Sequence, residues 1–170
     1  MTMKNLHSKN VRVLGLAPSS YGCGFAVMEG KSALVAWGIK TAKGADKNAR
    51  SLSHVGNLIT HYKPHVIAIE DTRTKTSRRS RRIRALIAEI VIMAGDENIR
   101  VRRYSRKQVN MGFLSDERGT KHDVAEYLAG RFPEELASSL PPKRRAWDTD
   151  DYRLDIFSAV ALAEHFLRRS

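Results

Sequence analysis

Short apolar runs separated by turns open the chain and predict β-strands. The first three runs span residues 11–16, 22–29 and 33–40. Because they follow one another with only short connections, the simplest arrangement is an antiparallel meander. A fourth run, HVIAIED at 65–71, is continuously apolar up to its two acids. That pattern is typical of a central strand buried on both faces.

Apolar residues at helical spacing fill most of the remaining sequence. Residues 47–62 predict a helix that Pro64 ends, and residues 78–94 predict a second helix with Gly95 just past its end. The other expected elements are a half-buried strand at 99–104 and helices at 105–109, 121–132 and 148–167. The order βββ-α-β-α-β-α-α-α contains no internal repeat and predicts one α/β domain.

The length and the ends of the sequence bear on how the chain is organised. The chain has 170 residues, the size of one ordinary domain. We expect a flexible polar segment at 1–10 and a single domain over 11–170. The start MTMKNLHSKN has no apolar stretch typical of a secretory leader, and the single cysteine, Cys23, fits a reducing compartment.

Positive charge is the strongest compositional feature. The formal net charge is +12, from 30 Lys and Arg residues against 18 Asp and Glu residues. Between Arg73 and Lys107 there are twelve basic residues and only three acidic ones. The basic run RTKTSRRSRRIR lacks the apolar face that membrane binding needs, so the charge favours a nucleic-acid partner over a lipid surface. No GxxxxGK[ST] loop is present, so a nucleotide cofactor is not expected.

Acidic residues stand at places that an α/β sheet brings together. Glu70 ends a buried strand, and Asp148, Asp151 and Asp155 have the spacing i, i+3, i+7, which would place them on one helix face. Ala17 stands where the first strand ends. Since ligand sites of such sheets gather at the carboxyl ends of parallel strands, we expect these positions to converge.

Two interpretations of the acids follow from the residues alone. Glu70 and the three aspartates can hold Mg²⁺ or Mn²⁺, hard ions that bind carboxylate oxygens, and such ions beside a basic surface suit phosphodiester hydrolysis. Alternatively, Glu70 pairs with an arginine, and the acids near the start of the last helix only favour its dipole. Asp155 is the hardest to explain structurally, because a very apolar helix body, IFSAVALA, which we expect to be buried, follows it directly.

Five segments resemble the RuvC-type Holliday-junction resolvases. They are VLGLAPSSYGCGFAV, HVIAIED, YSRKQV, KHDVAEYL and DYRLDIFSAVALA, in the order and spacing of that family. The resemblance implies an RNase H-like fold, with a five-stranded mixed sheet of order 3-2-1-4-5 flanked by helices. It also implies a homodimer that nicks four-way DNA junctions with two Mg²⁺ or Mn²⁺ ions per active site. Such proteins occur in bacteria, phages and organelles, and we expect a cytoplasmic bacterial or phage protein.

The resemblance also assigns roles to residues. Glu70 and Asp155 match metal-binding acids of the family, and the acid expected three residues before Asp155 is replaced by Tyr152, with Asp151 one step away. Lys121 and Lys107 match basic residues near the scissile phosphate. The implied catalytic positions are Ala17, Glu70, Asp151, Asp155 and Lys121, and Asp148 is a further candidate metal ligand. The implied DNA contacts are Arg73, Lys75, Arg78, Arg79, Arg81, Arg82, Lys107 and Lys121.

Two departures from the family pattern change the functional expectation. The first-strand motif of the family carries an aspartate that bridges both metals, and this chain reads GLAPSS with Ala17 in that place. Catalysis should therefore be severely impaired. Either the chain is a natural protein that binds junctions without cleaving them, or the aspartate of an active enzyme was replaced by alanine. Because the rest of the motif is intact, we favour the replacement. In the loop after Glu70 an aromatic wedge of relatives is replaced by Arg73.

Other function classes remain open at this point. A non-catalytic nucleic-acid-binding module fits the missing aspartate, and tight junction binding without nicking would support it. A nuclease of the same fold acting on another substrate, such as an RNA–DNA hybrid or flap DNA, would differ only in its DNA-binding surface. A sugar-kinase or actin-like ATPase lobe is disfavoured, because those proteins close two lobes over a nucleotide and 170 residues supply one.

Overall fold

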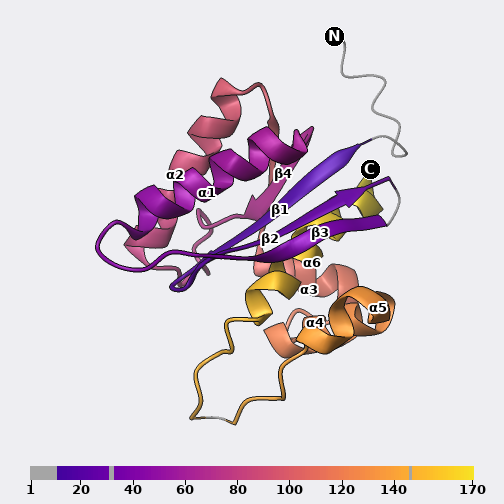
Figure 1. Cartoon of the computed structure of the whole chain (residues 1–170). Helices are drawn as coiled ribbons and strands as arrows, with labels where there is room; N and C mark the ends of the chain where they lie inside the picture. The colour runs from indigo at the N-terminus through magenta and orange to yellow at the C-terminus, as the bar shows by residue number, and fades with distance from the viewer. Residues whose placement is uncertain (1–10, 31–32, 146) are drawn as a thin grey trace.

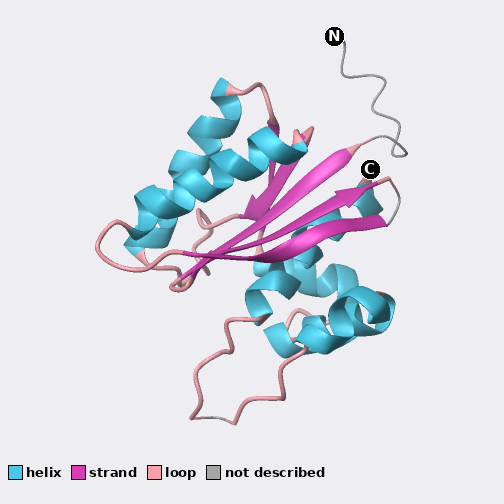
Figure 2. Ribbon diagram, viewed as in Figure 1, coloured by secondary structure: helices cyan, strands magenta, loops and turns pink. Residues whose placement is uncertain are grey.

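A mixed β-sheet forms the centre of the protein in a computed structural model that describes residues 11–30, 33–145 and 147–170. Its strands are β1 (Arg12–Ser19), β2 (Gly22–Glu29), β3 (Ala33–Thr41), β4 (Val66–Glu70) and β5 (Arg100–Tyr104). The strand order is β3-β2-β1-β4-β5, and Figure 2 shows the strands as one twisted sheet with helices on both sides. The first three strands are antiparallel, whereas β4 and β5 run parallel to β1. The predicted meander and sheet order are confirmed.

Helices cover both faces of this sheet. One face carries α1 (Lys47–Tyr62) and α2 (Arg81–Asp96). The other carries α3 (Arg106–Leu114), α4 (Lys121–Arg131), α5 (Pro133–Leu136), the 3₁₀ turn η2 (Ala137–Ser139) and α6 (Leu154–Arg169) (Figure 1). Each layer encloses its own apolar core. None of the helices described is long and apolar enough to cross a bilayer.

Alternation along β1 and β4 decides which side chains face which layer. Leu14 and Leu16 pack toward α1 and α2, while Val13 and Ala17 belong to the core beneath α6. On β4 the same alternation places Ala68 among the residues under α6. Because successive strand side chains point to opposite faces, Glu70, two positions further, points to the α6 side as well.

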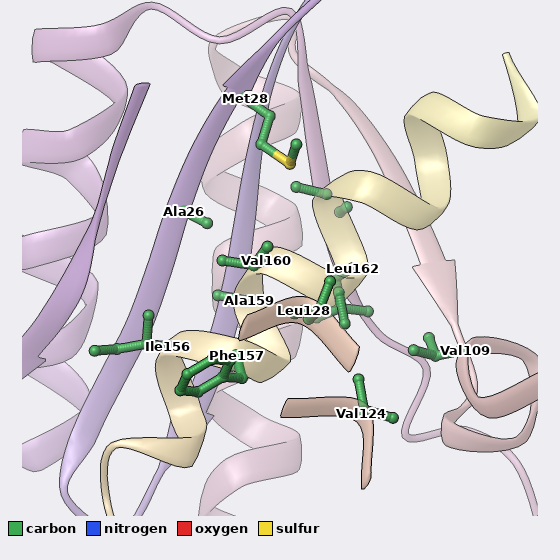
Figure 3. Packing of buried hydrophobic residues seen from close by; sticks show 14 of the residues in the cluster. Ala26, Met28, Val109, Val124, Leu128, Ile156, Phe157, Ala159, Val160 and Leu162 are labelled. Atoms are coloured by element: carbon green, nitrogen blue, oxygen red, sulfur yellow. The ribbon is translucent and has the colours of Figure 1, made fainter. Parts of the chain in front are cut away.

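Helix α6 lies unusually close to β1 and β2. Two glycines permit this approach: a Cβ on Gly15 would lie 2.1 Å from the Ala159 carbonyl oxygen, and a Cβ on Gly24 would lie 2.3 Å from that of Asp155. The buried side chains of α6, Phe157 and Val160 among them, then fill the space between the sheet and α4 (Figure 3). This close packing fixes where Asp155 sits.

Several expected element boundaries were wrong. Helix α2 begins at Arg81 instead of residue 78, because the Ser80 side chain accepts the Ile83 N–H and caps the helix there. Gly95 lies inside that helix, and Asn98 takes the left-handed conformation beyond its end, with φ 58°. The last helix starts at Leu154 and not at residue 148. The expected flexible segment, 1–10, lies outside the described residues.

Candidate functional site

Ala17, Glu70 and Asp155 come together at one edge of the sheet. The parallel register of β1 and β4 pairs Leu16 with Ile69, so Ala17 and Glu70 are the next residues on adjacent strands. The antiparallel register pairs Ala17 with Gly24, against which the start of α6 packs. All three residues line one pocket with a volume of about 80 Å³. The expected convergence holds for these positions.

Asp155 is a buried carboxylate to which one side chain of the described residues, Ser19, donates a hydrogen bond. Its exposed fraction is 8%, and the Ser19 hydroxyl donates to its Oδ2 at 2.5 Å. Burial raises the pKa of the Asp155 carboxyl above its usual range, while Ser19 and the positive charges of Lys121 and Arg79 act in the opposite direction. The sequence pattern did not single out Ser19, yet its hydroxyl holds the Asp155 carboxylate in place.

Glu70 faces a cation across the same pocket. The Arg79 Nε lies 3.1 Å from Glu70 Oε2, and the guanidinium also donates to the Pro18 carbonyl. Arg79 lies in the segment that leads into α2, so it ties this segment to the ends of β1 and β4. The ion pair expected as the structural alternative for Glu70 is therefore present.

Lys121 enters the pocket from the first turn of α4. The Thr120 side chain accepts the Asp123 N–H, and Asp123 accepts the Thr120 N–H, a reciprocal capping box that fixes the start of the helix. Burial lowers the pKa of the Lys121 ammonium, and nearby Arg79 lowers it further, whereas Asp155 and Asp150 raise it. Lys121 Nζ lies 3.9 Å from Asp150 Oδ2.

Asp148 and Asp151 do not share a helix face with Asp155, because both precede α6. Asp151 pairs with Arg153 at 2.8 Å, and this pairing lowers the pKa of its carboxyl. Asp148 accepts the backbone N–H of Arg145 at 3.1 Å. The argument from helical spacing was wrong for these two residues, and their assignment as ligands stays a prediction.

The expected DNA-contacting residues fall into two groups. Arg79 and Lys121 line the pocket, while Arg82 points inward and donates to the Ser19 carbonyl at 3.1 Å. The others lie on the surface: Arg73, which pairs with Asp71, Lys107, which pairs with Glu117, and Lys75, Arg78 and Arg81. Their contact with DNA stays a prediction.

Sequence reasoning missed four residues around the pocket. Tyr104 and Arg106 line it, at the end of β5 and the start of α3. Asp150 faces Lys121, and Ser19 holds Asp155. The motif YSRKQV marks the position of Arg106, but the neighbouring Lys107 drew attention because it matches a family residue.

The donor set does not fit two divalent ions. Among the residues that the structure describes, no group of three or more His, Cys, Asp and Glu side chains is placed to hold a metal. Ala17 has no ligand atom, Glu70 is paired with Arg79, and Asp155 is held by Ser19. A two-ion site needs several carboxylate oxygens that are free to bind the ions, whereas cations surround the two carboxylates of this pocket.

Comparison with known proteins gives a clear result for structure and none for sequence. No family model matches the chain, and no curated protein matches it. The Thermus thermophilus RuvC structure is 17% identical, with a TM-score of 0.66, and the match covers 94% of this chain and 96% of that one. The yeast mitochondrial Holliday junction resolvase Ydc2 is 13% identical with a TM-score of 0.66, covering 94% of this chain and 79% of that one.

A viral structure adds to this comparison. The fowlpox virus resolvase in complex with Holliday junction DNA is 13% identical with a TM-score of 0.56, and the match covers 93% of this chain and 99% of that one. These similarities extend over nearly the whole chain and include the sheet order 3-2-1-4-5. The chain therefore has the fold of the RuvC-type Holliday-junction resolvases.

Proposed function

We propose that this chain binds four-way DNA junctions and that its hydrolytic step is severely impaired. The observation that carries the proposal is a resolvase fold whose carboxylate pocket is surrounded by cations. Two similar structures, T. thermophilus RuvC and the fowlpox resolvase, are complexes with Holliday junction DNA. The net charge of +12 supplies the attraction for the DNA backbone that such binding requires.

Impaired hydrolysis follows from the pocket itself. Ala17 stands between Glu70 and Asp155 and offers no oxygen to a metal. Arg79 and Lys121 instead place positive charge beside the two carboxylates without any ion. These cations are suited to bind a DNA phosphate directly. An aspartate at position 17 would add the third carboxylate that Mg²⁺ or Mn²⁺ binding and nuclease activity require.

We also propose that the chain acts as a homodimer, with α2 in the contact. Ile92 on this helix is 65% exposed, more than any other large aliphatic side chain that the structure describes. It lies in a shallow hollow with Leu52 and Met93, and the acidic residues Glu89, Asp96 and Glu97 complete the lining. Sedimentation equilibrium should show a dimer at micromolar concentration that Ile92→Glu dissociates. A chain that stays monomeric at that concentration overturns this proposal.

The test of junction binding compares DNA shapes of identical sequence. Binding of a synthetic four-way junction, its linear duplex and an RNA–DNA hybrid is measured in EDTA at several salt concentrations. We expect the junction to bind at least about tenfold more tightly than the duplex, a difference of about 1.4 kcal/mol. Equal affinity for junction and duplex refutes the proposal. Preference for the hybrid indicates instead a protein of the same fold with another substrate.

A further inference from the structure

Two exposed tyrosines lie together beside the carboxylate pocket. Tyr21 occupies the turn between β1 and β2, and Tyr152 comes just before α6. Their ring centroids are 6.0 Å apart, with an angle of 57° between the planes. Tyr21 is 45% exposed and Tyr152 50% exposed, so each ring keeps much of its surface open to solvent. We call these two residues the tyrosine pair.

The tyrosine pair borders a hollow whose lining includes two lysines. The hollow has a volume of about 510 Å³ and is lined by Ser20, Tyr21, Thr41, Ala42, Lys43, Gly44, Lys47 and Tyr152. Lys47 Nζ donates to the Ser20 carbonyl at 3.1 Å, which holds its ammonium at the rim. None of these lining residues is acidic. An occupant that presents both an aromatic face and a negative charge therefore matches the hollow.

Hydrogen bonds connect the hollow to the carboxylate pocket. The Tyr21 backbone N–H donates to the Ser19 hydroxyl at 3.2 Å, and this hydroxyl donates to Asp155. Tyr152 accepts the Asp155 backbone N–H through its carbonyl at 3.1 Å. A DNA strand whose phosphate lies at the carboxylate pocket thus has the tyrosine pair within reach of a neighbouring nucleotide.

A purely structural role leaves these features unexplained. Contact between the two rings covers only part of each, and a half-exposed aromatic pair adds little to the stability of the core. Tyrosine rings offer a flat apolar face on which any base can stack, and lysines beside them attract the phosphate of the same nucleotide. Nucleic-acid-binding proteins use this combination for strands whose bases are unpaired.

We propose that the tyrosine pair stacks on a nucleobase that is unpaired at the branch point of a DNA junction, with Lys43 and Lys47 binding the adjacent phosphate. This inference rests on the proposed function and adds to it the residues that distinguish a branch point from a continuous duplex. Because a paired base inside a duplex has no free face, the tyrosine pair contributes to junction binding and not to duplex binding.

The test compares variants that keep or remove the aromatic rings. The double variant Tyr21→Leu with Tyr152→Leu removes both rings, whereas the matched Tyr21→Phe with Tyr152→Phe keeps them and removes only the hydroxyls. We expect the leucine variant to bind the junction about 5-fold to 100-fold more weakly, with duplex affinity unchanged, and the phenylalanine variant to bind both normally. If the double leucine variant does not fold, the two single leucine variants are measured instead.

A fluorescence measurement shows directly whether the base at the branch point contacts the tyrosine pair. A junction with 2-aminopurine at the branch point should change its fluorescence on binding to the unaltered chain and to the phenylalanine variant. The change should disappear with the leucine variant. The same probe within an arm should give no such difference. If a protein partner occupies the hollow instead of DNA, the leucine and phenylalanine variants behave alike in every DNA measurement. That result overturns the proposal.

The salt dependence of junction binding tests whether the two lysines bind phosphate. Replacing Lys43 and Lys47 by glutamine should lower the slope of log affinity against log salt by about 0.7 for each phosphate that a lysine no longer neutralises. Lys63→Gln, at the opposite end of α1, is the matched control and should leave the slope as it is. This inference alone is overturned if the chain prefers junctions, but the lysine variants keep the salt slope of the unaltered chain and the leucine and phenylalanine variants bind the junction equally tightly. A chain without junction preference overturns the proposed function as well.

Discussion

Gly24→Ala tests whether close packing of α6 on the sheet positions the site. Gly24 lies within β2, opposite Ala17, and has no positive φ, so a larger residue is excluded by space and not by backbone conformation. A Cβ there would lie 2.3 Å from the Asp155 carbonyl oxygen and 2.5 Å from its carbonyl carbon. Both are backbone atoms that cannot rotate away. The start of α6 must therefore move off the sheet.

We expect Gly24→Ala to lower stability by an amount near the upper end of the range seen when a packed interior is overfilled. Extra methylene groups in a packed interior commonly cost about 1–3 kcal/mol, when side chains can adjust. Here a helix backbone must shift, and the buried side chains of α6, such as Phe157, shift with it. We expect Gly24→Ala to lower the free energy of unfolding by about 3 kcal/mol, which a domain of ordinary stability survives folded.

Urea unfolding followed by circular dichroism measures this change. The matched control is Gly130→Ala in α4, where a Cβ meets no described atom within 4 Å apart from its chain neighbours and the backbone of its own helix, and helix propensity favours alanine by up to about 1 kcal/mol. Because Asp155 moves with α6, Gly24→Ala should also weaken junction binding, whereas Gly130→Ala should not. A loss below about 1 kcal/mol for Gly24→Ala would refute the close approach of α6 to β2.

Three further changes test other parts of the account. Burial raises the pKa of the Cys23 thiol from about 9 to about 12. The protonated thiol therefore contributes its full stability below about pH 9, and the free energy of unfolding falls by about 1.4 kcal/mol per pH unit between about pH 9 and pH 12. Cys23→Ala should remove this slope in urea titrations at increasing pH. Thr120→Ala should cost about 1 kcal/mol in the same assay by breaking the α4 capping box, while Thr120→Ser should not. Arg131→Met should cost about 3 kcal/mol, because among the residues that the structure describes it leaves the fully buried Glu164 with Arg168 alone, at 3.7 Å. A thermal midpoint unchanged from that of the parent would contradict this.

The strands were predictable because their apolar runs are short and separated by turn residues. The first strand nevertheless extends to Ser19, three residues beyond its expected end, because Ala17 to Ser19 pair with Gly22 to Gly24. Pairing of this kind depends on the register between two strands, which the apolar pattern of either strand does not specify. The extension matters for the site, since it carries Ser19 to Asp155.

The last helix shows where periodicity misleads. Asp148, Asp151 and Asp155 have helical spacing, but the chain before Leu154 forms turns in which Asp151 pairs with Arg153. Local side-chain pairing of this kind competes with helix formation at an acidic, polar segment. Asp155 was predictable as the buried acid because the apolar body of α6 follows it.

The sequence did not reveal which residues pair with the carboxylates of the pocket. Twelve basic residues between 73 and 107 are equivalent candidates for pairing with Glu70, and only the folded chain selects Arg79. The same holds for the tyrosine pair, whose members stand 131 positions apart and meet only because the turn after β1 lies beside the start of α6. Contacts between distant segments depend on the fold as a whole.

The most direct test of the account compares the chain with its Ala17→Asp variant on a four-way junction, scoring binding in EDTA and nicking with Mg²⁺ or Mn²⁺. Ala17→Asn, of similar size but uncharged, is the control. We predict that all three bind the junction and that only Ala17→Asp nicks it, at least about 100-fold faster than the others, a difference of about 2.7 kcal/mol in activation free energy. Nicking by the unaltered chain at the rate of the aspartate variant, or no nicking by any of the three, would contradict the role assigned to Ala17.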